Sequence, residues 1–127
     1  MKVHLRVPAN SESNSIRIFG KVNIASRTAT QKAVIFVTVT CVETGDSLQG
    51  ELIINVSSSE QSIIFLTGNL AGANTQGNTI EILFEREAGQ GDDDASRSAL
   101  SINNIQIAND TRSVSGKKKS SEFSYRL

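Results

Sequence analysis

The chain has little of the residue types on which most active sites and covalent staples depend. Its 127 residues include one Cys, one His, one Pro and no Trp. A single thiol excludes an internal disulfide framework and any zinc site built from several cysteines. A single imidazole leaves His4 as the one histidine for acid–base work or metal binding. We therefore predict that the protein is not an enzyme.

An excess of charge is also missing. The 13 Lys and Arg residues balance 13 Asp and Glu residues, which argues against a protein that coats nucleic acid through bulk positive charge. The charges are nevertheless segregated: residues 1–32 carry +5, residues 33–110 carry −9 and residues 111–127 carry +4. This polarity favours head-to-tail contacts between copies, and neutralisation within the monomer is the alternative.

No apolar run approaches the length of a membrane span. The segment from Met1 to Val7 alternates between charged and apolar residues, so it lacks the continuous apolar core of a signal peptide. We therefore expect a protein that is made in a cytoplasm and is not secreted by a signal peptide. The single thiol of Cys41 agrees with that compartment.

The residues that are abundant favour strands. Val, Ile and Thr make up 31 of the 127 residues, and their branched side chains fit a pleated surface. Apolar residues recur with a period of two in seven runs, at 2–7, 15–24, 33–42, 48–56, 79–86, 99–107 and 122–127, and residues 63–66 are a continuous apolar run that predicts a short buried strand. Regular strands separated by turn residues predict an all-β chain, a single-domain antiparallel β-sandwich over residues 1–127 that is jelly-roll-like.

Three local features refine this prediction. The run 33–42 begins with apolar residues on both faces, which places it centrally in a sheet and buries Cys41 as a small apolar side chain. Gly20 interrupts an inward face, which indicates a bulge or a close crossing. The alternation changes phase at Asn103 and Asn104, as a bulge requires.

The densest acidic segment is a candidate metal site. Asp92, Asp93 and Asp94 follow a Gly-Gln-Gly sequence, and Ca²⁺ prefers several oxygen ligands held close together. Adjacent side chains in an extended chain point to opposite sides, so a solvated acidic loop is the alternative. No other cofactor is expected.

Basic residues offer candidate interfaces. Lys117, Lys118 and Lys119 suit a phosphate, a lipid headgroup or an acidic neighbour, with a solvated loop as the alternative. If the runs 2–7 and 15–24 pair as a hairpin, one outward face presents a larger set. Its members are Lys2, His4, Arg6, Arg17, Phe19 and Lys21. We expect His4 to be a surface histidine, and Phe123 and Tyr125 to pack in the core rather than stack on bases.

Two segments resemble small jelly-roll proteins of bacteriophage virions, of the capsid-decorating or tail-associated type. One is residues 3–9, VHLRVPA, followed by a polar loop and an alternating strand. The other joins residues 78–87, NTIEILFERE, through the Asp-rich loop to residues 99–107, ALSINNIQI. The resemblance implies a non-enzymatic, oligomeric virion component, and it transfers no binding residue.

The first hypothesis is therefore a virion structural protein that packs against copies of itself and other virion proteins. The alternative is a carbohydrate-binding module or adhesin domain supported by Ca²⁺ at Asp92–Asp94, although such sites usually stack sugars on exposed aromatic rings. This chain offers no Trp and one Tyr for that purpose. A third hypothesis, single-stranded nucleic-acid binding through the basic hairpin, is the weakest because the net charge is zero.

Overall fold

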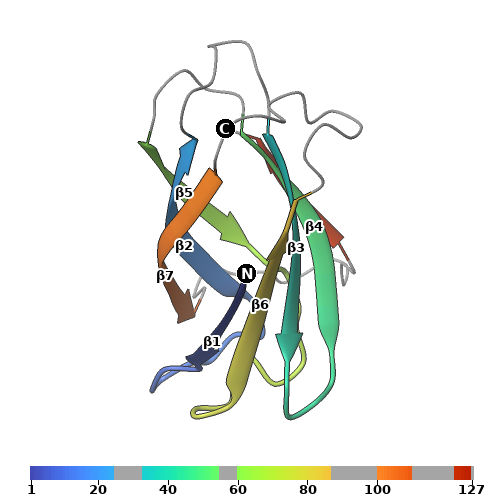
Figure 1. Cartoon of the computed structure of the whole chain (residues 1–127). Helices are drawn as coiled ribbons and strands as arrows, with labels where there is room; N and C mark the ends of the chain where they lie inside the picture. The colour runs from blue at the N-terminus through green and yellow to red at the C-terminus, as the bar shows by residue number, and fades with distance from the viewer. Residues whose placement is uncertain (25–32, 55–59, 87–99, 110–121, 127) are drawn as a thin grey trace.

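The described part of the chain consists of strands, turns and loops, and it contains no helix (Figure 1). The computed structural model describes residues 1–24, 33–54, 60–86, 100–109 and 122–126. The strands are β1 (Lys2–Arg6), β2 (Ile16–Ile24), β3 (Ala33–Cys41), β4 (Ser47–Ile54), β5 (Glu60–Leu66), β6 (Thr79–Glu85), β7 (Leu100–Asn109) and β8 (Glu122–Arg126). Each strand overlaps one of the eight predicted runs, although β5 begins three residues before the run 63–66, so the all-β class is confirmed.

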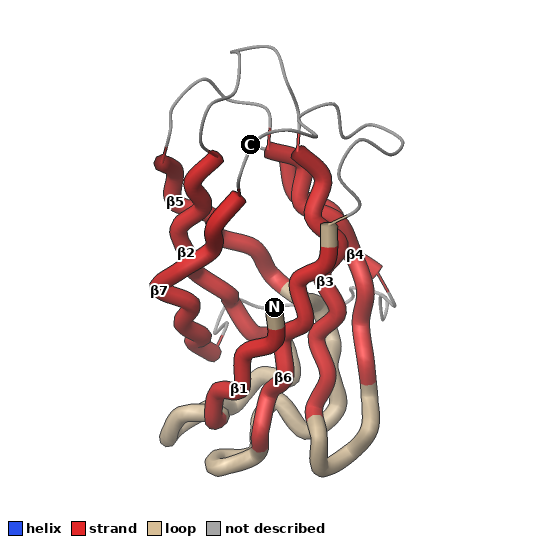
Figure 2. Tube along the Cα trace, viewed as in Figure 1, coloured by secondary structure: helices blue, strands red, loops and turns tan. Residues whose placement is uncertain are grey.

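These strands form two sheets that face each other as a sandwich (Figure 2). The smaller sheet has the order β5-β2-β7 and is antiparallel. The larger has the order β1-β6-β3-β4-β8 and is antiparallel from β1 to β4, whereas β8 pairs in parallel with β4. Parallel pairing needs a crossover of about a dozen residues or more, and residues 55–121 separate these two strands. The β-sandwich is confirmed, and the jelly-roll connectivity stays a prediction.

Alternation along the strands explains the core. On β3, the residues at odd positions are buried and point toward the smaller sheet, while Phe36, Thr38 and Thr40 point outward. Inward residues of β6 and β4 complete this side of the core, and they are Ile80, Ile82, Phe84, Leu48, Leu52 and Ile54. As predicted, β3 lies at the centre of its sheet and Cys41 is fully buried.

A β-bulge interrupts the regular pairing of β2 with β7 at the position that the sequence indicated. The register pairs Phe19 with Gln106 and Lys21 with Asn103, so Gly20 faces two residues of β7. Asn104, one of these two, has a φ of 56°, a left-handed conformation that Asn tolerates better than most residues. A Cβ atom at Gly20 would lie 2.5 Å from Cδ1 of Ile105, so the absent side chain gives Ile105 room to pack. Both readings of Gly20, the bulge and the close crossing, are confirmed.

Candidate functional site

The predicted basic hairpin does not form. β1 pairs with β6 in the larger sheet, whereas β2 pairs with β5 and β7 in the smaller one. After β1, the chain stays attached to β6, because the Val7 amide donates to the Asn78 carbonyl at 2.8 Å and the Gly77 amide donates back to the Val7 carbonyl at 3.0 Å. Only then does it cross to the other sheet. The prediction of one continuous basic face is therefore wrong.

The basic residues of β1 contact groups within the same chain. His4 pairs with Glu81 in the strand register, and its Nε2 lies 3.0 Å from Glu81 Oε1. Lys2 Nζ lies 3.7 Å from the same carboxylate oxygen, and the Arg6 guanidinium donates to the Gly77 carbonyl at 3.0 Å. His4 is on the surface, as predicted, but it has the carboxylate partner that the local sequence did not reveal. Neutralisation within the monomer therefore accounts for this part of the charge pattern.

The basic residues of β2 lie on the outward face of the smaller sheet, beside a shallow groove of about 480 Å³. The side chains of this face are called the basic face below, and they are Arg17, Phe19, Lys21, Ser62, Ile64, Asn104 and Gln106. Phe19 pairs with Ile64 of β5 on one side and with Gln106 of β7 on the other. The groove has an apolar floor and a rim of hydroxyl, amide and ammonium groups, a lining suited to contact with another molecule.

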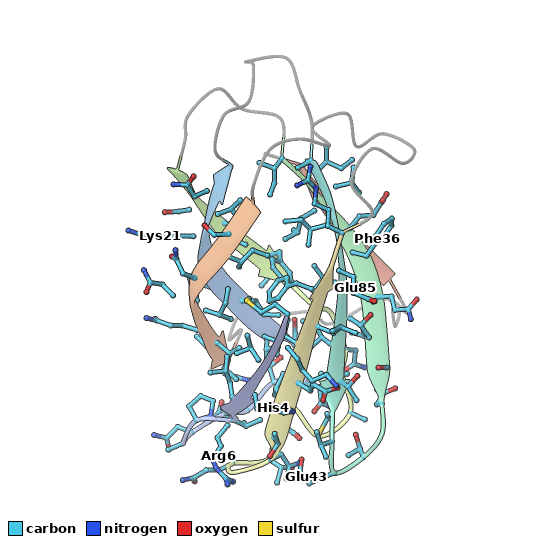
Figure 3. The ribbon with its side chains drawn as sticks, in the orientation of Figure 1. His4, Arg6, Lys21, Phe36, Glu43 and Glu85 are labelled. Atoms are coloured by element: carbon cyan, nitrogen blue, oxygen red, sulfur yellow. The ribbon has the colours of Figure 1, made fainter. Side chains whose placement is uncertain are left out.

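The outward face of the larger sheet has a local cluster of negative charge around Phe36, beside the basic residues Lys2, His4 and Arg6 of its edge strand β1. Phe36 is 42% exposed at the middle of this sheet. The register places Glu51 of β4 directly opposite it on one side and Glu85 of β6 on the other. Directly opposed side chains in a sheet have Cβ atoms about 4.5–5.5 Å apart, so two carboxylates flank an exposed ring. Phe36, Glu51 and Glu85 are called the acidic face below, and Figure 3 shows Phe36 and Glu85 on the side of the molecule opposite to Lys21.

A third cluster of polar groups connects the turn that follows β3 to the segment that precedes β6. Glu43 Oε1 accepts a hydrogen bond from the Thr79 amide at 2.7 Å, and Asp46 Oδ2 accepts one from the Ala71 amide at 2.8 Å. The Thr44 hydroxyl donates to the Ala71 carbonyl at 2.8 Å. Each of these side chains therefore holds backbone in place, and the cluster fastens the turn after β3 to the loop before β6.

The hydrogen bond from the Thr79 amide lowers the pKa of Glu43 below its ordinary value near 4.5, because the amide stabilises the carboxylate form. A lowered pKa in the folded state adds stability that is present above the ordinary value and is lost as the pH falls through the folded value. We therefore expect Glu43→Gln to be less stable than the parent at neutral pH, with a difference that shrinks in acid. Urea denaturation midpoints at about pH 7 and about pH 3 measure this convergence. The matched control is Glu12→Gln in an exposed loop, and a Glu43→Gln difference that did not change with pH would contradict the assigned hydrogen bond.

Other predicted site residues fall outside the described ranges. Asp92–Asp94 and Lys117–Lys119 lie in the segments 87–99 and 110–121, so the calcium site and the basic block stay predictions. Within the ranges that the structure describes, no three His, Cys, Asp or Glu side chains gather to hold a metal ion. Nor does that part of the chain contain a helix long and apolar enough to cross a membrane.

The candidate interface residues that the sequence analysis did not single out are exposed apolar side chains on strands expected to be buried. Phe36 belongs to a run that was read as buried, and Ile64 to a strand expected to be buried throughout, yet Ile64 is 41% exposed. A signal was present: Phe36 shares its parity with Thr38 and Thr40, which marks that face of the run as the polar one.

Comparisons of this chain with family models, with characterised proteins and with solved structures find no match.

Proposed function

We propose that the protein is a non-enzymatic structural subunit that associates with copies of itself, as a component of a bacteriophage virion. One observation carries the proposal: Phe36 on one outer face lies between Glu51 and Glu85, whereas Phe19 on the other lies between Arg17 and Lys21. Surfaces of this kind, apolar at the centre and charged at the rim, are suited to protein contacts.

The polar cluster between the turns supports the non-enzymatic part of the proposal, because its carboxylates hold backbone groups of the same chain. The carboxylates of Glu43 and Asp46 bind backbone amides, so they secure the fold. The resemblance of residues 3–9 and 78–107 to small virion jelly rolls supports the virion as the assembly, and a jelly-roll connectivity belongs to the same proposal.

Carbohydrate binding is less well supported by the same groove. Its rim contains Ser62, Asn104 and Gln106, which are suitable partners for sugar hydroxyls, and Phe19 offers one ring. Saccharide sites usually need a broad exposed aromatic platform. Phe19 is a single ring that its neighbours partly cover, so it does not form such a platform. The groove therefore suits an apolar side chain better than a sugar.

The proposal predicts that the purified chain forms a defined oligomer or a repeating assembly. Sedimentation velocity over a concentration series, with electron microscopy of the largest species, measures it. We expect mass to rise above the 13.6 kDa of one chain as concentration increases. A chain that remains monomeric at about millimolar concentration, far above the range of specific interfaces, would contradict the proposed function.

A further inference from the structure

The acidic face presents a projecting aromatic side chain. Phe36 stands on the central strand of its sheet and keeps 42% of its surface exposed, although the rest of the β3 side chains are buried or half-buried. A large apolar side chain in the middle of a sheet face costs free energy while water covers it. Its two register partners, Glu51 and Glu85, keep the ring accessible and surround it with negative charge.

The basic face presents a matching hollow. The groove of about 480 Å³ lies beside the outward side chains of Phe19 and Ile64, and Lys21 also lines it. A cavity of about 150 Å³ is enough for a benzene ring, so the groove has room for one phenyl side chain with space at its open side.

The charges around the two features are complementary. Within the described residues, Glu81 makes the ion pairs of the larger sheet, with Lys2 and His4, whereas Glu51 and Glu85 make none. Arg17 and Lys21 flank Phe19 on the basic face. The carboxylates beside the projecting ring are therefore opposite in sign to the cations beside the hollow, and complementary charges of this kind steer two surfaces together and fix their register.

We propose that copies of this chain dock head to tail, with Phe36 of one copy seated in the Phe19–Ile64 groove of the next and with Glu51 and Glu85 facing Lys21 and Arg17. The inference rests on the proposed function, since it names the contact by which the copies assemble. The two faces lie on opposite sides of the sandwich, as Figure 3 shows for Phe36 and Lys21. The contact is therefore heterologous, and it extends into a ring or a filament according to the rotation between neighbours.

Two variants test the contact separately on each face. Phe36→Ser removes the projecting ring, and Lys21→Glu reverses the charge beside the groove. Each is expected to weaken self-association about tenfold or more, as for a residue at the centre of an interface, when measured by sedimentation velocity. The matched control is Val42→Ser, which removes a side chain that is 52% exposed in the turn after β3 and belongs to neither face. Val42→Ser should associate like the parent chain.

Mixing the two variants distinguishes a head-to-tail contact from a symmetric one. Phe36→Ser keeps an intact basic face, and Lys21→Glu keeps an intact acidic face. An equimolar mixture should therefore form one species of twice the 13.6 kDa monomer mass, which cannot grow further because both of its remaining faces are damaged. This recovery also shows that both variants are folded.

Several outcomes would overturn the inference. If the parent chain assembles but both variants assemble as well as it does, the contact lies elsewhere and the proposed function stands. The same conclusion follows if both variants lose association and the mixture stays monomeric while circular dichroism shows both to be folded. If the parent chain does not associate at all, the proposed function fails together with the contact. Amide shift changes confined to Phe19, Asn104 and Gln106 on addition of chitohexaose, in a chain that stays monomeric, would assign the groove to a carbohydrate instead.

Discussion

Replacing Gly72 by alanine is expected to lower the free energy of unfolding by about 2–4 kcal/mol, because the change combines backbone strain with overpacking. Gly72 has a φ of +89°, a conformation that L side chains rarely adopt. A Cβ atom there would lie 2.7 Å from Cys41 Sγ and 2.7 Å from Thr44 Cγ2. Neither neighbour can retreat easily, since Cys41 is fully buried and the Thr44 hydroxyl is held by the Ala71 carbonyl.

Gly77→Ala is the matched control for this substitution. Gly77 has nearly the same φ, +88°, but nothing lies within 4 Å of the Cβ position. The control therefore includes only the backbone cost, about 1–2 kcal/mol. Urea denaturation of both variants measures the difference. Equal losses would mean that the loop before β6 does not pack against the end of β3 as the structure has it.

Truncating Ile63 to alanine is expected to cost about 2–5 kcal/mol of unfolding free energy, as for other large-to-small substitutions in a core. Ile63 is 1% exposed, so its removal leaves a cavity between the sheets. Ile64→Ala, the same change one residue later on β5, should cost less than about 1 kcal/mol, because that side chain is already 41% in water.

The two isoleucine variants should also differ in self-association, which we expect Ile64→Ala to weaken although it is the more stable of the two. Ile64 lines the groove of the basic face, so Ile64→Ala is expected to weaken self-association while its urea midpoint stays close to that of the parent. Ile63→Ala lowers the midpoint sharply. If both variants lost the same stability, the register that pairs Gly20 with Ile63 and Phe19 with Ile64 would be wrong.

Much of the fold could be predicted from the sequence, because alternation is a local signal. The period of two in residues 33–42 was enough to place a strand, and its doubly apolar start was enough to put β3 at the centre of its sheet. The phase change at Asn103 and Asn104 identified a bulge, since only an extra residue can restore the inward face after a shift of parity.

The partners of each strand could not be predicted in the same way. Alternation shows which side chains of β1 and β2 face inward, but an inward face fits either sheet of a sandwich. The choice depends on contacts distant in sequence, such as the pairing of His4 with Glu81. The surroundings of Phe36 depend on the same kind of information, because Glu51 and Glu85 flank it only once β4 and β6 both pair with β3.

The bulge at Gly20 and Asn104 also disfavours the addition of a foreign strand at the edge of the smaller sheet. β7 is an edge strand of ten residues, and a long regular edge offers unpaired amide and carbonyl groups on which a foreign strand can add. The extra residue interrupts that row near its middle and increases the local twist. Lateral addition of strands, the route to amyloid-like fibres, is thereby disfavoured along the longest edge of the sandwich.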